Sequence, residues 1–262
     1  MDFGNWIGIL PLWAVFAFTL VVCIGSVEVG TVLAGIVLRQ KNEKEPEGPL
    51  GSVVGSLLGL LAFILAFTFG MAASRFDARR QLVLDEANAI GTTYLRADLL
   101  PQKEGVEVQK LLREYAQIRL NLADKNIDEI LKSSTDTQGQ LWAQAKLLVK
   151  EEMDSELRSL FITSLNELID LHQSRVTIGL QRRIPGTVWL AVYLLTALSM
   201  LAVGYQVGMS GIRRLRGTPV LAAAFSLVIV MIADIDRPAE GLMRVSQQAI
   251  ADVQQMMLGN TP

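Results

Sequence analysis

The 262-residue sequence contains a single cysteine, Cys23, and a single histidine, His172. One cysteine cannot form an internal disulfide, so it carries no information about the redox compartment. Zinc sites need clusters of thiolates and imidazoles, and nucleophilic catalysis needs a nucleophile paired with a base. Because neither set can be assembled from these residues, we predict no metal site, no cofactor and no enzymatic activity.

Charged residues are also scarce. They make up 19% of the chain, against roughly 25% in a typical soluble domain. Hydrophobic residues make up 51%, and the mean hydropathy is +0.36. The formal net charge is −2, and no basic domain indicates a nucleic-acid partner. The first ten residues, "MDFGNWIGIL", lack the basic stretch of a signal peptide, which favours a first apolar segment that is retained.

The sequence contains four long apolar stretches. Each is close to or above the roughly 17–20 residues that a helix needs to cross the hydrocarbon of a bilayer. The sequence therefore predicts an all-α integral membrane protein, with four transmembrane helices in two pairs and a helical domain between spans two and three. The predicted spans are residues 6–38, 50–73, 185–207 and 218–235, with a helical extramembrane domain at 74–184 and a C-terminal tail at 236–262.

The middle domain has helical periodicity. Apolar residues such as Val83, Ala87 and Ile90 recur at helical spacing, and we expect these stripes to bury against each other and against neighbouring subunits. Two polar stretches, "LLPQKEG" at 99–105 and "SSTDTQG" at 133–139, are predicted to break the helices.

Every fourth residue of the second span forms one row, which starts with glycines and continues through Phe63, Phe67 and Met71 to Arg75. An i, i+4 row drifts slowly around a helix, so these residues share one face. Glycines are typical of close helix packing in membranes. The phenyl rings have three possible roles: they pack in the bundle core, they face lipid, or they gate a pore by dewetting. The positive edge of a phenyl ring can also face a passing anion.

Glu28 is the one ionisable residue well inside the first span, near mid-bilayer at about 1.5 Å of rise per residue. The small residues Ser26, Gly30 and Ala34 lie beside it and indicate a face that packs on protein. An ionised carboxylate there is costly, so it should be protonated, paired or in contact with water. The sequence leaves two roles open for Glu28, a structural carboxyl or a proton or cation relay.

The fourth span ends in "DIDRP", which contains Asp234, Asp236, Arg237 and Pro238. Proline prevents simple continuation of the helix, and aspartate favours caps and turns. We predict an interfacial turn whose aspartates cap backbone amides or pair with arginines. Coordination of an ion at the mouth of a pathway is the secondary interpretation.

Three stretches resemble a known family. "FTFGMAASRFDARR" (67–80) is similar to the bestrophin anion channels, in which a phenylalanine on the second span precedes small residues and an arginine-bearing continuation. Phe67 and Arg75 fall at matching positions. "DEANAIGTTYLRADLLP" (85–101) and "DIDRPAEGLMRVS" (234–246) resemble more specifically the four-span bestrophin-like proteins of bacteria and plants.

This resemblance implies a homo-oligomeric, anion-conducting channel, a pentamer, whose pore is lined by the second span. Its partners would be the lipid bilayer and small ions, and its location a bacterial inner membrane. The resemblance also implies a cytosolic middle domain, whereas the nearly balanced arginines and lysines lean slightly towards an external one. In this channel hypothesis we place Gly59, Phe63 and Phe67 at a neck with Met71 below it, and mouth charges at Arg75, Arg79 and Arg80.

The sequence also departs from the bestrophin pattern. Gly70 stands where bestrophins usually have asparagine, and Phe76 and Asp77 replace paired tryptophans. Only five residues precede the first span, so calcium gating is not carried over. Two rival functions stay open, which are a proton-coupled transporter or stator-like unit built around Glu28, and a membrane scaffold with no permeation path.

Overall fold

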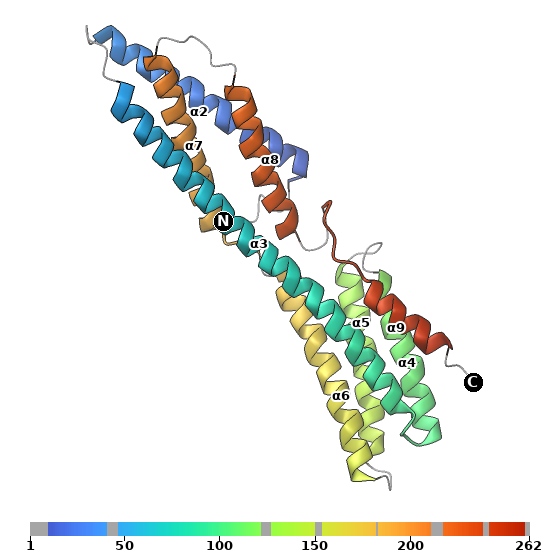
Figure 1. The fold of residues 1–262 in the computed structure, drawn as a ribbon. Helices are drawn as coiled ribbons and strands as arrows, with labels where there is room; N and C mark the ends of the chain where they lie inside the picture. The colour runs from blue at the N-terminus through green and yellow to red at the C-terminus, as the bar shows by residue number, and fades with distance from the viewer. Residues whose placement is uncertain are drawn as a thin grey trace. The chain divides into compact units, whose positions relative to one another are not determined.

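A computed structural model describes residues 10–40, 47–121, 127–149, 154–181, 183–210, 217–237 and 241–259, and these residues contain helices and no strand (Figure 1). This confirms the predicted all-α class. The helices are α2 (Leu12–Gln40), α3 (Glu47–Ala97), α4 (Gln102–Leu120), α5 (Ile127–Leu148), α6 (Ser155–Ser174), the π-helical segment η2 (Arg175–Gln181), α7 (Gly186–Met209), α8 (Thr218–Asp236) and α9 (Gln248–Gly259).

The chain forms two compact units. Unit 1 comprises residues 1–76 and 183–243, and unit 2 comprises residues 77–182 and 244–262. Four helices are long and apolar enough to cross a membrane, namely α2, α3, α7 and α8. α3 runs without interruption for 51 residues, so one helix supplies both a span of unit 1 and the first helix of unit 2.

In unit 1, α2 and α7 pack through glycines. A Cβ atom on Gly30 would lie 2.1 Å from the carbonyl oxygen of Leu201, and a Cβ on Gly204 would lie 2.1 Å from the carbonyl oxygen of Val27. Only a hydrogen fits in either position, so the two backbones approach closely. Ala34 is fully buried nearby. The small-residue face predicted on the first span therefore does pack on protein.

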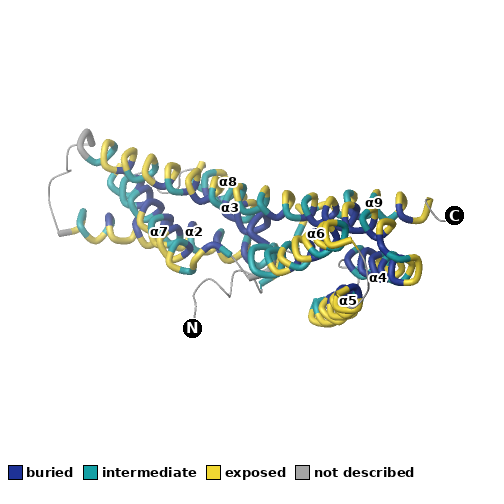
Figure 2. The backbone as a smooth tube through the Cα atoms, turned by 90° about the horizontal axis from the view of Figure 1, so that it is seen from below, coloured by how far each residue is buried: buried dark blue, intermediate teal, exposed yellow. Residues whose placement is uncertain are grey.

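Unit 2 has a core of its own. The stripe of Val83, Ala87 and Ile90 is buried, as its periodicity predicted, together with residues of α4, α5, α6 and α9. Figure 2 shows these buried segments in dark blue beside exposed outer faces. The hydroxyl of Tyr94 donates a hydrogen bond to the carbonyl oxygen of Met257 (3.1 Å), which ties the C-terminal helix to α3.

One of the two predicted helix breaks is wrong. α3 does end at Ala97 before "LLPQKEG", but α5 continues through "SSTDTQG". The hydroxyls of Thr135 and Thr137 donate to carbonyl oxygens one turn earlier, at 2.9 and 3.0 Å. These bonds satisfy the polar side chains inside the helix. Ser134 and Gln138 are buried, so tertiary packing outweighs the low helix propensity of this stretch.

The glycine contact between α2 and α7 yields a testable prediction. Gly204→Ala places a methyl group against the backbone of Val27, which cannot move as a side chain could, so we expect a loss of about 1–3 kcal/mol of stability. Gly25→Ala is the matched control, because its Cβ meets nothing within 4 Å. Thermal melts in mild detergent check both variants. Equal melting temperatures for the two variants would contradict the contact.

Candidate functional site

The residues predicted to form a neck lie on an uncovered face of α3. Phe63 and Phe67 are 65% and 62% exposed, Gly59 is exposed, and Met71 is half-buried. The opposite face of the same helix carries Leu61 and other buried residues that pack against α7 and α8. The two rings are therefore not part of the core of unit 1, which removes one of the three roles that the sequence left open.

The glycines on this face of α3 also have open surroundings. A Cβ atom on Gly55, Gly59 or Gly70 would meet nothing within 4 Å. These glycines therefore do not serve packing within the chain, in contrast to Gly30 and Gly204. A hollow of about 570 Å³ follows on the same helix, lined by Ala66, Phe67, Gly70, Met71, Ser74 and Arg75.

An ion pair joins α3 to the end of α8 in unit 1. The Nη1 atom of Arg75 on α3 lies 3.6 Å from Oδ1 of Asp236 at the end of α8. Both carboxylate oxygens of Asp236 also accept from the backbone N–H of Ile184, each at 3.1 Å. Asp236 thereby joins α3, α8 and the residues that precede α7. The positive charge of Arg75 is balanced by a buried carboxylate.

Asp234 and Arg237 fix the turn that follows α8. The two carboxylate oxygens of Asp234 accept from the backbone N–H groups of Leu242 (2.8 Å) and Met243 (3.1 Å). The guanidinium of Arg237 donates to the carbonyl oxygen of Leu10. The described residues thus show the predicted turn, in which aspartates cap amides and pair with arginine, while Pro238 lies outside them.

The other two predicted mouth arginines differ from each other. Arg80 is exposed, but Arg79 is only 5% exposed. Of these two side chains, only Arg80 is therefore well exposed to solvent in the single chain, and the role of both as mouth charges stays a prediction. Burial of this face of α3 begins within one turn of the end of unit 1, and the charge pattern of the sequence gave no sign of it.

Glu28 is exposed on α2, outside the face that packs on α7. The side chains around it that share this exposure are apolar, namely Ile24, Val29 and Val32. The hydroxyl of Thr31 donates to the backbone oxygen of Glu28 at 2.8 Å and does not contact its carboxyl. Within this chain, Glu28 is a carboxyl on an otherwise apolar exposed surface of α2.

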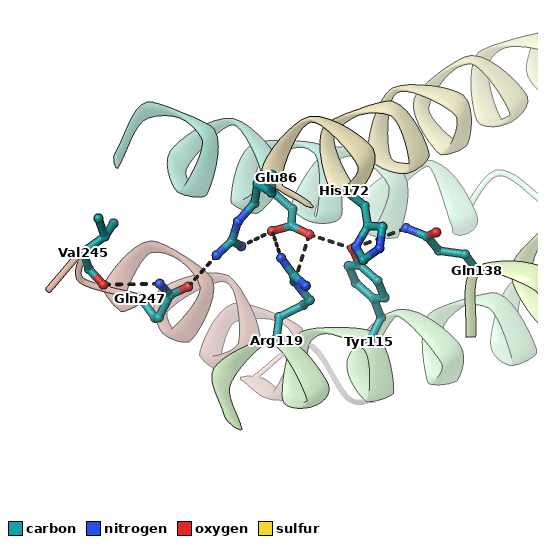
Figure 3. A network of polar contacts seen from close by, with 8 residues as sticks. Glu86, Tyr115, Arg119, Gln138, His172, Val245 and Gln247 are labelled. Atoms are coloured by element: carbon teal, nitrogen blue, oxygen red, sulfur yellow. Dashed lines mark hydrogen bonds and ion pairs between the residues drawn. The ribbon is translucent and has the colours of Figure 1, made fainter. Parts of the chain in front are cut away.

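Sequence reasoning missed a buried charge cluster in unit 2. Glu86 on α3 is completely buried and contacts three donors (Figure 3). The Tyr115 hydroxyl donates to it at 2.6 Å, and the Arg119 guanidinium lies 3.1 Å from its Oε1. The guanidinium of Arg175 pairs with Oε2. A buried carboxylate with this many donors is satisfied as an anion.

The cluster joins α3, α4, α5, α6 and η2, and it extends to the residue before α9. The Tyr115 hydroxyl on α4 lies 3.2 Å from Nδ1 of His172 on α6, and the Gln138 amide of α5 donates to it at 3.4 Å. Arg175 of η2 also donates to the side-chain oxygen of Gln247, the residue before α9, at 3.1 Å. The sole histidine of the chain is therefore held in place inside a polar network.

The network shifts the pKa values of its members. Burial raises the pKa of Glu86, but the positive charges of Arg175 and Arg119 and the hydrogen bond from Tyr115 outweigh this effect, so the pKa is lowered. Burial and the charge of Arg119 lower the pKa of His172 from 6.5 to about 4. At neutral pH the cluster thus holds an ionised glutamate and a neutral histidine between two arginines.

A signal for this cluster does exist in the sequence. Glu86 sits within the apolar stripe of Val83, Ala87 and Ile90, and a carboxylate on a buried face requires a cation or several donors. The partners could not be chosen, because Arg119 and Arg175 lie 33 and 89 residues further along the chain. Their identity depends on tertiary packing.

Stability of unit 2 should fall as the pH falls from 6.5 towards 4. In that range the unfolded state binds a proton at His172 and the folded state does not, so acid favours unfolding by about 2 kcal/mol at pH 5. Glu86 has a lowered pKa, so its contribution is lost only below its ordinary value of 4.5. His172→Gln removes the titrating group and should flatten the dependence between pH 7 and pH 5. Thermal melts check this, and equal slopes in both proteins would contradict the assignment.

A family model described as a bestrophin-like domain matches residues 13–250. No curated protein matches the chain. A mutant form of a bacterial bestrophin homolog from Klebsiella pneumoniae is 14% identical, with a TM-score of 0.63 over 94% of this chain and 99% of that chain. Another structure of the bestrophin homolog from that bacterium, obtained by Zn-SAD phasing, is 15% identical, with a TM-score of 0.59 over 96% of this chain and all of that chain.

The family model and the similar solved structures each cover most of the chain. The solved structures share the helical arrangement at low identity, and the four apolar helices fit an integral membrane protein. The chain therefore belongs to the bestrophin-like family.

Proposed function

We propose that this protein is a homo-oligomeric, anion-conducting channel whose pore is lined by α3. The observation that carries the proposal is the face of α3 that none of the described helices of unit 1 covers. It runs from Gly55 and Gly59 through Phe63 and Phe67 to the hollow that ends at Arg75. Membership of the bestrophin-like family supports the same function.

The physical argument concerns what could cover this face. A helix surface with glycines presents shallow grooves, and membrane helices use such grooves to bring copies close together. In a cyclic assembly, each copy would then contribute Phe63 and Phe67 to an axis. A collar of rings is reluctant to admit water, so an ion must lose part of its hydration or wait until the collar widens. The positive edges of the rings favour an anion.

Arg75 and its counter-ion belong to the same pathway in this proposal. The guanidinium is 25% exposed and lines the hollow below Phe67, while Asp236 balances its charge. A paired arginine offers a hydrogen-bonding surface to an anion without trapping it as a bare charge would, since conduction requires binding weak enough for release.

Replacement of both rings tests the pore directly. Because Phe63 and Phe67 are more than 60% exposed, Phe63→Ala/Phe67→Ala should not cost the roughly 3–5 kcal/mol of a core phenylalanine. We expect a larger single-channel conductance and weaker gating in planar bilayers, with little change in melting temperature. Phe69→Ala is the matched control, since this ring lies about 160° around the helix from Phe67 at 100° per residue and should leave the current unchanged.

Two outcomes would refute the channel proposal. One is an unchanged current in the double variant beside a clearly lowered melting point, which would assign the rings to packing. The other is a monodisperse monomer in mild detergent, measured by native mass spectrometry on the same preparation. We propose a pentamer for this assembly, from the resemblance to bestrophins, and the mass reports the number of chains.

Glu28 supports a second candidate, a proton-coupled transporter or stator-like unit. Its carboxyl is exposed on an apolar face of α2, where a relay would need to be accessible. We expect Glu28→Gln to leave the assembly and its conductance intact, because the amide retains hydrogen-bonding capacity without the charge. Loss of a proton flux into liposomes on this change alone, with an unaltered melting temperature, would favour the transporter.

A further inference from the structure

Two apolar side chains beyond the end of α8 face open space in unit 1. Leu242 is 88% exposed and Met243 is 47% exposed. Among the large hydrophobic residues that the structure describes, Leu242 is the most exposed. A pair of neighbouring apolar side chains in such a position needs a partner that removes them from water.

The backbone of this pair is held in one defined conformation. Each oxygen of the Asp234 carboxylate accepts from one of the two amides, Leu242 at 2.8 Å and Met243 at 3.1 Å. Gly241 has a φ of +135°, and a Cβ at this position would lie 2.2 Å from Oδ1 of Asp234. We call this arrangement the aspartate clamp. Because the clamp holds both amides by hydrogen bonds, the two side chains are exposed in a turn of defined conformation.

The clamp lies at the end of α8, one of the four helices that are long and apolar enough to cross a membrane. Asp234 belongs to the last turn of α8, a helix long enough only just to cross the hydrocarbon at 19 residues. Arg237 donates to the carbonyl oxygen of Leu10, two residues before α2 begins. The end of α8 and the start of α2 therefore lie at the same end of unit 1. Trp13, in the first turn of α2, is 74% exposed there.

We propose that Leu242 and Met243, together with Trp13, form a lipid anchor that enters the boundary between phospholipid headgroups and acyl chains. Tryptophan is enriched at this depth of a bilayer. Asp234 in the last turn of α8 holds both amides, so Leu242 and Met243 stay close to the end of that helix. The clamp satisfies two amides that would otherwise lose their water on insertion. This anchor is independent of the proposed channel activity.

Fluorescence quenching by lipids tests the anchor in the full-length chain. Cys23→Ala removes the single buried cysteine, and Leu242→Cys then carries an environment-sensitive nitrobenzoxadiazole label. In phosphatidylcholine–phosphatidylglycerol vesicles, we expect blue-shifted emission that nitroxides near the headgroup quench more strongly than nitroxides near the chain ends. The same label at Trp13→Cys should give the same depth. Leu99→Cys, an apolar position of unit 2 that is 47% exposed, should be quenched by aqueous iodide and not by lipid.

A second variant tests the clamp itself. Gly241→Ala places a methyl group where the Asp234 carboxylate lies, so lipid quenching of the label at position 242 should fall while the label at position 13 keeps its depth. Quenching of position 242 by iodide alone would overturn the proposal. Protection from both quenchers, with disulfide-linked dimers of the unlabelled Leu242→Cys chain, would assign the pair to a neighbouring copy and would also overturn it. Unchanged lipid quenching in Gly241→Ala would refute the role of the clamp.

Discussion

The carboxylate of Asp236 connects three elements of unit 1. It accepts from the amide that precedes α7, it pairs with Arg75 on α3, and its own backbone ends α8. Charges at the end of a span are tolerated only when they are paired or hydrated. Asp236 therefore ties α3, α8 and the start of α7 together at this end of unit 1, beside the apolar cluster that packs the same helices.

Unit 2 also contains a buried carboxylate, Glu86, that needs positively charged partners. A single glutamate faces two arginines, so the cluster carries excess positive charge, and the histidine beside it stays neutral. Removing one member of such a buried set is far more costly than replacing the whole set with apolar residues. The donors to Glu86 come from α4 and η2, so the carboxylate is satisfied when these two elements pack against α3 as they do here (Figure 3).

The sequence predicted the helical class, the family and the packed small-residue face of the first span, because each depends on local composition or on periodicity. It also predicted that Asp236 would pair or cap, since a charge at the end of a span has few alternatives. Arg79, Arg119 and Arg175 could not be placed, because an arginine on a helix can face water, a carboxylate or a carbonyl oxygen. The helical state of "SSTDTQG" could not be predicted either, because it depends on the burial of Ser134 and Gln138 by tertiary packing.

Unit 2 consists of two segments that are separated in the sequence, residues 77–182 and 244–262, and this separation affects the order of its synthesis. Glu86 leaves the ribosome 33 residues ahead of Arg119 and 89 residues ahead of Arg175. At about 5–20 residues per second, its carboxylate waits for several seconds or longer before both partners exist. Gln247 and α9 emerge only after α7 and α8 have been translated. Completion of unit 2 must therefore follow synthesis of α7 and α8, so that translation order places the last contacts of its core after the last two apolar helices.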